Sequence, residues 1–150
     1  MKPELKIGVS QILKSIIIMY DKTFEEVLER FRSISFSEQF DMIVAIANGG
    51  IIPAAILNQR LGIEIQLLKI NLRDSNQRPI YDSPQLMAPI DFEFKDKTIL
   101  LVEDRVKTGA SLTKACELLK DAKIIKTFAV NGKADYSLYD ETCFKFPWLL

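Results

Sequence analysis

The 150-residue sequence contains no histidine and only two cysteines, Cys116 and Cys143. Without imidazole, the chain cannot carry a Ser-His-Asp or Cys-His catalytic arrangement or a metal site with histidine ligands. Two cysteines far apart in sequence are too few for a zinc cluster or a disulfide framework. We expect both to be reduced packing residues, so any chemistry must rest on other side chains.

Long hydrophobic runs are also missing. The apolar run Ile16–Met19 is far shorter than the roughly 20 residues that a bilayer requires. The opening residues, MKPELKIG, contain no signal-peptide core. These features predict a cytoplasmic protein with no membrane partner.

Neither sign of charge is in excess, because 20 Lys and Arg residues balance 20 Asp and Glu residues. A net charge of zero provides no overall field for binding nucleic acid, although composition leaves open a local basic patch. The 48% of hydrophobic and 27% of charged residues are typical of a folded globular protein. We predict a single domain over residues 1–150 with no nucleic-acid partner.

Helix and strand patterns alternate along the chain. Thr23 and Glu26 form a capping box, and apolar residues follow at helical spacing. Pro53 and Gly62 mark the first turn and the end of another helix. The predicted order is helix 23–32, strand 41–47, a helix ending at 61, strand 63–70, strand 97–104, helix 111–120 and strand 124–130. This order predicts an α/β fold with a mostly parallel sheet and helices on both faces.

The segment Asn71–Glu93 interrupts the alternation. It contains three prolines and shows little periodicity. Long loops inside compact domains are uncommon and are often functional. The segment is therefore interpreted either as a cover for an active site or as a mobile surface loop.

The most informative stretch is ILLVEDRVKTGASL, residues Ile99–Leu112. Glu103 and Asp104 follow an apolar strand, and ligands bind at the carboxyl ends of strands in such sheets, where adjacent acids can accept hydrogen bonds from a sugar diol. The following turn leads into a helix N-terminus, which binds anions through free N–H groups and the helix dipole. Its residues are Lys107, Thr108, Gly109, Ala110 and Ser111. A diol site beside a phosphate site fits a ribose 5-phosphate group.

Taken alone, the two acids favour solvated residues at a strand end, and the turn alone favours a simple helix cap. As one string, however, the stretch resembles the signature of the type I phosphoribosyltransferase family, in which an apolar strand precedes two acids, variable residues and Thr-Gly-x-Ser/Thr. Three further segments are similar to the pyrophosphate loop of the family and to the flexible loop and C-terminal hood of its bacterial xanthine and guanine branch. They are IVAIANGGIIPA (Ile43–Ala54), LRDSNQR (Leu72–Arg78) and ETCFKFPW (Glu141–Trp148).

The resemblance implies the type I phosphoribosyltransferase fold, with a hood from the N-terminal segment and about residues 131–150, and a flexible loop at about 71–93. It implies transfer of 5-phosphoribose from phosphoribosyl pyrophosphate to a 6-oxopurine base, with Mg²⁺ bridging diphosphate and ribose oxygens. Relatives commonly dimerise, so a homodimer is expected. The alternative is a weak or inactive regulatory protein that binds phosphoribosyl pyrophosphate or a nucleotide.

The resemblance also implies roles for individual residues. Glu103 and Asp104 are expected to be catalytic and to hold the metal, and Lys107 to be catalytic. The Ala47–Asn48 peptide bond is expected to be cis, as in relatives. The expected substrate-binding residues are Ala47, Asn48, Gly49, Gly50, Arg78, Arg105, Val106, Thr108, Gly109, Ala110, Ser111 and Phe144.

Several positions depart from the purine branch. Lys107 stands where an Asp is usual, and Arg105 stands where an apolar residue is usual. Their side chains either bring positive charge toward the base, which would favour xanthine, or turn outward to solvent or phosphate.

Other departures concern the base and leaving-group sites. Val130 replaces a basic residue that only a shifted Lys133 could supply, and Asn48 replaces a basic residue before the two glycines. Cys143 replaces an aromatic residue that stacks on the base, which leaves Phe144 or Trp148 as substitutes. We expect Trp148 to be a packing residue.

Overall fold

The computed structural model describes residues 8, 9, 21–71, 78 and 80–150. Within these residues the strands form one sheet in the order β3-β2-β1-β4-β5-β6. They are β1 (Met42–Ala47), β2 (Ile65–Asn71), β3 (Gln85–Leu86), β4 (Thr98–Arg105), β5 (Ile124–Asn131) and β6 (Tyr136–Tyr139). All neighbouring pairs are parallel except β2 and β3, which are antiparallel. The predicted α/β fold is confirmed.

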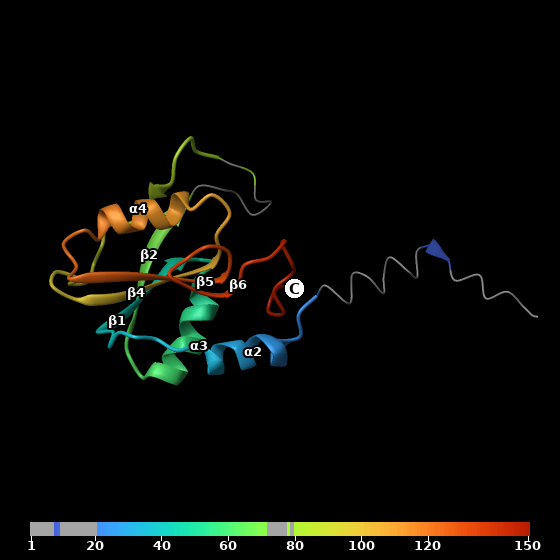
Figure 1. The fold of residues 1–150 in the computed structure, drawn as a ribbon. Coiled ribbons are helices and arrows are strands. Elements are labelled where there is room, and N and C mark those ends of the chain that lie inside the picture. Colours follow the sequence, from blue (N-terminus) through green and yellow to red (C-terminus); the bar gives the residue numbers. More distant parts are fainter. Residues whose placement is uncertain (1–7, 10–20, 72–77, 79) are drawn as a thin grey trace, which may run out of the picture.

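Helices cover both faces of the sheet. Figure 1 shows α4 (Ala110–Leu118) above the sheet, and α2 (Phe24–Ser33) and α3 (Ile51–Leu61) below it. The predicted capping box starts α2, since the Thr23 N–H donates to Glu26 and the Glu26 N–H donates to the Thr23 hydroxyl. The α3 helix ends at Gly62 with φ of 67°, a left-handed conformation that glycine adopts readily.

The central strands are buried on both faces, which explains their nearly continuous apolar sequence. Alternate β1 residues belong to different cores: Ile43 and Ala45 pack on the side of α2 and α3, whereas Val44 and Ile46 pack on the side of α4. The two cores hold β1 and β4 rigidly from both sides. The strand ends that carry the acids and the glycine loop are therefore firmly supported.

Two strands were not predicted. The β3 strand lies within the segment Asn71–Glu93, of which residues 72–77 and 79 lie outside the described part, so the interpretation as an active-site cover stays a prediction. The β6 strand follows β5 after a short turn and pairs with it in parallel, Phe128 opposite Tyr136. Both strands are too short to produce a recognisable alternating pattern.

The cysteines differ in their surroundings. Both are free thiols; Cys116 belongs to α4 and is half-buried against the core, whereas Cys143 is exposed. The prediction of a packing role is therefore confirmed for Cys116 and wrong for Cys143, which lies in a short surface connection. In the part of the chain that the structure describes, no helix combines the length and apolar character needed to cross a bilayer.

Candidate active site

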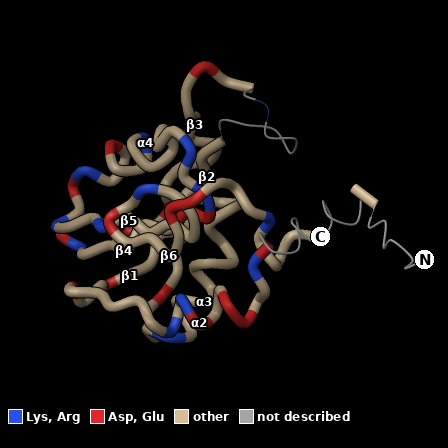
Figure 2. Tube along the Cα trace, turned by 45° about the vertical axis from the view of Figure 1, so that its right-hand side comes forward, with Lys and Arg blue, Asp and Glu red and all other residues tan. Residues whose placement is uncertain are grey.

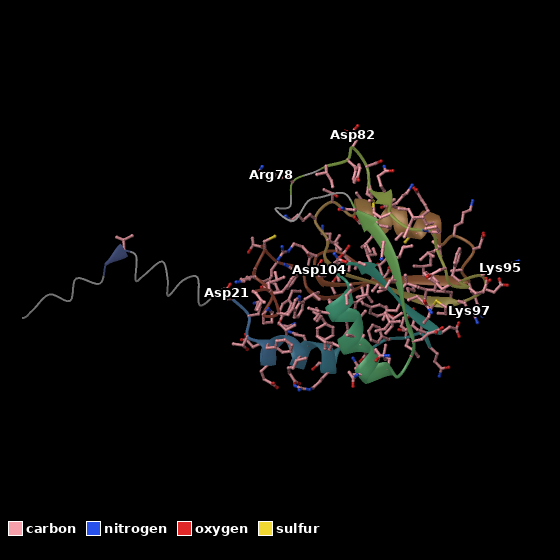
Figure 3. All side chains as sticks on the ribbon, turned by 180° about the vertical axis from the view of Figure 1, so that it is seen from behind. Asp21, Arg78, Asp82, Lys95, Lys97 and Asp104 are labelled. Carbon is pink, nitrogen blue, oxygen red and sulfur yellow. The ribbon has the colours of Figure 1, made fainter. Side chains whose placement is uncertain are left out.

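A cavity of about 260 Å³ lies where β1 and β4 end. Figure 3 shows Asp104 near the middle of the molecule, at the end of the strand that carries the two acids. Acidic and basic residues are interspersed along the chain in Figure 2, so the chemistry of the cavity depends on its own residues. The lining consists of Ile46, Ala47, Gly49, Ile70, Asn71, Glu103, Asp104, Arg105, Val106, Lys107, Thr108, Gly109, Ala110, Ser111, Leu112 and Leu149.

The loop after β1 approaches the acids very closely. The Ala47–Asn48 peptide bond is cis, as expected from the resemblance. A Cβ atom on Gly49 would lie 2.6 Å from Asp104 Oδ1, and a Cβ atom on Gly50 would lie 2.3 Å from the Val102 carbonyl oxygen. At Gly50 a side chain would collide with backbone, which leaves room only for glycine, whereas at Gly49 it would displace the Asp104 carboxylate.

The two acids lie side by side, and each carboxylate accepts a hydrogen bond from the backbone N–H of the next residue. The Asp104 N–H donates to Glu103 Oε1 over 3.0 Å, and the Arg105 N–H donates to Asp104 Oδ1 over 2.6 Å. Burial, reinforced by the neighbouring Asp104 carboxylate, raises the pKa of Glu103 well above its usual range. A cation or a diol placed here would relieve the repulsion between the two carboxylates.

The turn before α4 is open toward the cavity. Gly109 adopts φ of 79°, and no side chain caps the helix, although the Thr108 hydroxyl accepts a bond from the Ala110 N–H over 3.3 Å. The first N–H groups of a helix have no acceptor within the helix. Together with the helix dipole, they form a site for an anion such as a phosphate group.

The donor set at the strand end fits a hard divalent cation. Glu103 and Asp104 supply carboxylate oxygens to the cavity, which are ligands that Mg²⁺ prefers. Among the described residues, no group of three or more His, Cys, Asp or Glu side chains is arranged to hold a metal ion alone. A cation bound here would need further oxygen ligands from substrate and water, as is usual for Mg²⁺.

The two unusual basic residues point in different directions. Arg105 Nη2 donates to the Phe144 carbonyl oxygen over 2.7 Å, and its guanidinium lies 4.6 Å from the centre of the Phe146 ring. Lys107 is exposed at the rim of the cavity. Arg105 therefore turns toward the C-terminal segment, which we define as residues 141–150, rather than into solvent.

Four residues predicted to bind substrate do not line the cavity: Asn48, Gly50, Arg78 and Phe144. Asn48 is exposed, Gly50 is buried behind the loop, and Arg78 lies far out on its loop, away from Asp104 in Figure 3. The ring of Phe144 is only 6% exposed and packs edge-on against Tyr139. The structure thus places this ring in the core and not against the cavity.

The nearby Trp148 stacks on Phe146 with ring centres 5.1 Å apart, and its edge contacts Phe24. This arrangement confirms the predicted packing role. Val130 is fully buried, and Lys133 is exposed beside α4, away from the cavity lining.

Sequence reasoning missed several lining residues, namely Ile46, Ile70, Asn71, Leu112 and Leu149. Asn71 could have been found, because it is a polar residue at the carboxyl end of a strand adjacent to β1. Leu149 carries no comparable signal. It reaches the cavity only because the C-terminal segment folds back over the sheet.

Comparisons with known proteins agree with this geometry. The phosphoribosyl transferase domain family matches residues 9–146 of the chain. A xanthine-guanine phosphoribosyltransferase of Vibrio parahaemolyticus is 31% identical over 142 residues, covering 90% of this chain and 89% of that protein. The purine phosphoribosyltransferase of Pyrococcus horikoshii has a TM-score of 0.70 at 27% identity, covering 85% of this chain and 91% of that chain.

A Neisseria gonorrhoeae protein solved with bound ppGpp has a TM-score of 0.67 at 20% identity, covering 85% of this chain and 86% of that chain, which shows a likeness of fold alone. The family match spans most of the chain, and it includes the strand-end acids, the glycine loop and the turn before α4. The chain therefore has the type I phosphoribosyltransferase fold, belongs to the phosphoribosyltransferase family and is an enzyme of the glycosyltransferase class.

Proposed function

We propose that the protein transfers 5-phosphoribose from phosphoribosyl pyrophosphate to a 6-oxopurine, namely xanthine, guanine or hypoxanthine, and releases pyrophosphate. The observation that carries the proposal is the contact of the glycine loop with Asp104 in a cavity that the turn 107–111 also lines. Sites for a diphosphate, a diol and a phosphate thus line one cavity. Relatives named xanthine-guanine phosphoribosyltransferase favour a purine acceptor.

Each part of the first substrate has a counterpart in the cavity. The 5-phosphate binds at the open N-terminus of α4, with the Thr108 and Ser111 hydroxyls as additional donors. The ribose hydroxyls donate to Glu103 and Asp104. The pyrophosphate group meets the backbone of the loop 47–50, where the absence of side chains allows close approach.

The transfer breaks the bond from the anomeric carbon to pyrophosphate and forms a bond to a base nitrogen. Such a carbon develops oxocarbenium-like positive charge, as in glycoside hydrolysis. Carboxylates beside the ribose stabilise that charge, and no nucleophilic side chain or histidine is needed. Lys107, exposed at the rim, adds positive charge where the phosphate groups enter.

Glu103 and Asp104 are the residues that would hold Mg²⁺ together with oxygens of the substrate. When bound, Mg²⁺ supplies charge neutralisation for the departing pyrophosphate. The protein residues then orient the ribose and exclude competing water.

We further infer a cytoplasmic homodimer in which residues 1–150 form one domain. The two free thiols are compatible with a reducing compartment. Ile51 and Ile52, at the start of α3, are 38% and 40% exposed and provide an apolar patch for a subunit contact. Sedimentation velocity at several concentrations tests the dimer, and a single monomeric species would contradict it.

The decisive experiment incubates the protein with phosphoribosyl pyrophosphate, Mg²⁺ and each of a panel of bases, and follows nucleotide and pyrophosphate formation. Turnover of a 6-oxopurine, lost in Asp104→Ala, supports the proposal. Tight binding of phosphoribosyl pyrophosphate without turnover of any base would instead identify a regulatory binding protein.

A further inference from the structure

One wall of the cavity is not used in the proposed binding of phosphoribosyl pyrophosphate. It consists of Arg105 and Val106 after the acids, and Leu149 from the C-terminal segment. Arg105 directly follows Asp104, where the ribose is proposed to bind. A base attached to that ribose lies within reach of Arg105.

The side chain of Arg105 is held firmly. Its Nη2 donates to the Phe144 carbonyl oxygen over 2.7 Å, and its guanidinium lies over the Phe146 ring at 4.6 Å. Its Nε is buried and has no hydrogen-bond acceptor. These contacts fix the guanidinium of a residue that lines the cavity, and they leave its Nε donor unsatisfied within the described residues.

In the described part of the chain, the positive charge of Arg105 has no ion-pair partner. A partly buried cation with an unsatisfied donor has lost hydration that its surroundings do not replace. A ligand that brings carbonyl oxygens or negative charge to this wall would restore the missing interactions.

Arg30 and Arg60 make the same two kinds of contact as Arg105, one with a carbonyl oxygen and one with an aromatic ring, yet neither has an unsatisfied buried nitrogen. Arg30 donates to the Leu138 carbonyl oxygen and lies over Tyr139 at 4.8 Å. Arg60 donates to the Phe31 carbonyl oxygen and lies over Phe36 at 5.6 Å. Neither is among the described residues that line the cavity, and neither has a buried nitrogen without an acceptor.

We propose that Arg105 selects the base, favouring a purine with oxygen atoms at both C2 and C6 that ionises readily over a purine without the C2 oxygen. This inference rests on the proposed transfer to a 6-oxopurine. Arginine suits the role because its planar fork keeps its charge and presents several donors to a carbonyl oxygen. Xanthine is the 6-oxopurine that matches, and hypoxanthine is the natural comparison.

The test measures kcat/KM for xanthine and for hypoxanthine in the wild-type protein, Arg105→Leu, Arg105→Lys and the matched control Arg30→Leu. We expect the xanthine to hypoxanthine ratio to fall at least tenfold in Arg105→Leu. It should fall less in Arg105→Lys, which keeps the charge and loses the fork. Arg30→Leu removes a similar hood contact outside the cavity and should keep the wild-type ratio.

An unchanged ratio in Arg105→Leu, with wild-type turnover of both bases, overturns the inference and leaves the proposed function intact. If the wild-type protein turns over no base, the proposed function fails, and calorimetric Kd values for the xanthine and hypoxanthine nucleotides test Arg105 instead. Thermal unfolding establishes that each variant folds. If Arg105→Leu does not fold, the ratio in Arg105→Lys decides, and an unchanged ratio there overturns the inference.

Discussion

The two sides of the cavity are built in different ways. The phosphoribose side consists of the loop 47–50, the strand-end acids 103–104 and the turn 107–111, where strands run directly into loops and helices. The base side combines Arg105 with the C-terminal segment, far away in the sequence. The first side is determined by local structure, whereas the second depends on contacts between distant residues.

The contacts that hold the C-terminal segment illustrate the difference. The Asn131 amide donates to the Glu141 carbonyl oxygen over 3.2 Å and accepts from the Glu141 N–H over 3.1 Å. Lys22 forms an ion pair of 2.7 Å with Glu141 and lies over the Tyr139 ring at 5.0 Å. Changes on this side should alter the choice of base while the phosphoribose side remains functional.

The strongest way to separate the two sides is to remove the diol acceptor with Asp104→Ala. We expect kcat/KM to fall about 100- to 1,000-fold for every base, which corresponds to about 3 to 4 kcal/mol. Because the loss concerns the shared ribose, the ratios between bases should change little. Steady-state kinetics with xanthine, guanine and hypoxanthine measure both quantities.

The control for this variant lies just before β1, beside the start of the strand that carries Asp104. Asp41 Oδ2 accepts a bond from the Thr98 N–H over 2.8 Å, so Asp41→Ala removes a carboxylate that supports β4 but lies outside the cavity. It should lower the thermal midpoint and keep kcat/KM near the wild-type value. Similar kinetic losses in both variants would mean that Asp104 acts through the fold.

The adjacent glycines provide a second comparison. In Gly49→Ala the new methyl group meets the movable end of the Asp104 side chain, so we expect a 10- to 100-fold loss of kcat/KM with little loss of stability. In Gly50→Ala it meets the backbone carbonyls of Val102 and Ile46, so we expect destabilisation by about 2 kcal/mol or more. Kinetics and urea unfolding of both variants distinguish the effects, and equal stability losses would refute the distinction.

The phosphoribose side could be predicted from sequence because strand, acids, glycines and helix start are neighbours along the chain. Periodicity located β1, β4 and α4 to within a few residues, and glycine and acid positions then indicated the loops. The rule that ligands bind at the carboxyl ends of parallel strands brought the two loops together. The resemblance to a known family supplied the substrate.

The base side could not be predicted in the same way. Nothing in the local sequence indicates that Arg105 bonds to Phe144, that the Phe144 ring turns into the core, or that Leu149 lines the cavity. These outcomes depend on how aromatic residues of the C-terminal segment pack with α2 and β6. Short irregular segments have no periodicity that reveals which side chain faces inward.

A third prediction addresses the attachment of the C-terminal segment. Asn131→Ala removes both hydrogen bonds to Glu141 from a residue that is 3% exposed, and we expect a loss of about 1 to 3 kcal/mol of stability. Because the segment covers the base side, KM for the base should rise several-fold while KM for phosphoribosyl pyrophosphate changes little.

Asn58→Ala is the matched control, since the Asn58 amide donates to the Ile63 carbonyl oxygen over 2.6 Å at the far end of α3. It should cost similar stability with no selective effect on either KM. If Asn131→Ala raises both KM values equally, the C-terminal segment does not act on the base side alone.

The smallest effect concerns the pH dependence of stability in the metal-free protein. Burial, with the nearby Asp104 carboxylate, raises the pKa of Glu103 above its ordinary value of 4.5, so the folded state holds this proton more tightly than the unfolded chain does. Its stabilising contribution is complete below the unfolded pKa and is lost as pH rises through the folded pKa. Above that range, the buried negative charge opposes folding.

Glu103→Gln removes this titration while keeping the shape of the side chain. We expect the free energy of unfolding of the variant, relative to wild type, to be nearly constant below the ordinary pKa of a glutamate and to increase as pH rises toward pH 8. Urea unfolding from pH 4 to pH 8, in the presence of a chelator, measures the difference. The kcat/KM of the variant should be lower than that of wild type, although its stability at pH 8 is higher, because the variant lacks a carboxylate that the proposed transfer uses beside the ribose. Parallel stability curves would mean that Glu103 is already well solvated or compensated in the free protein, and that the two acids do not repel each other enough to matter.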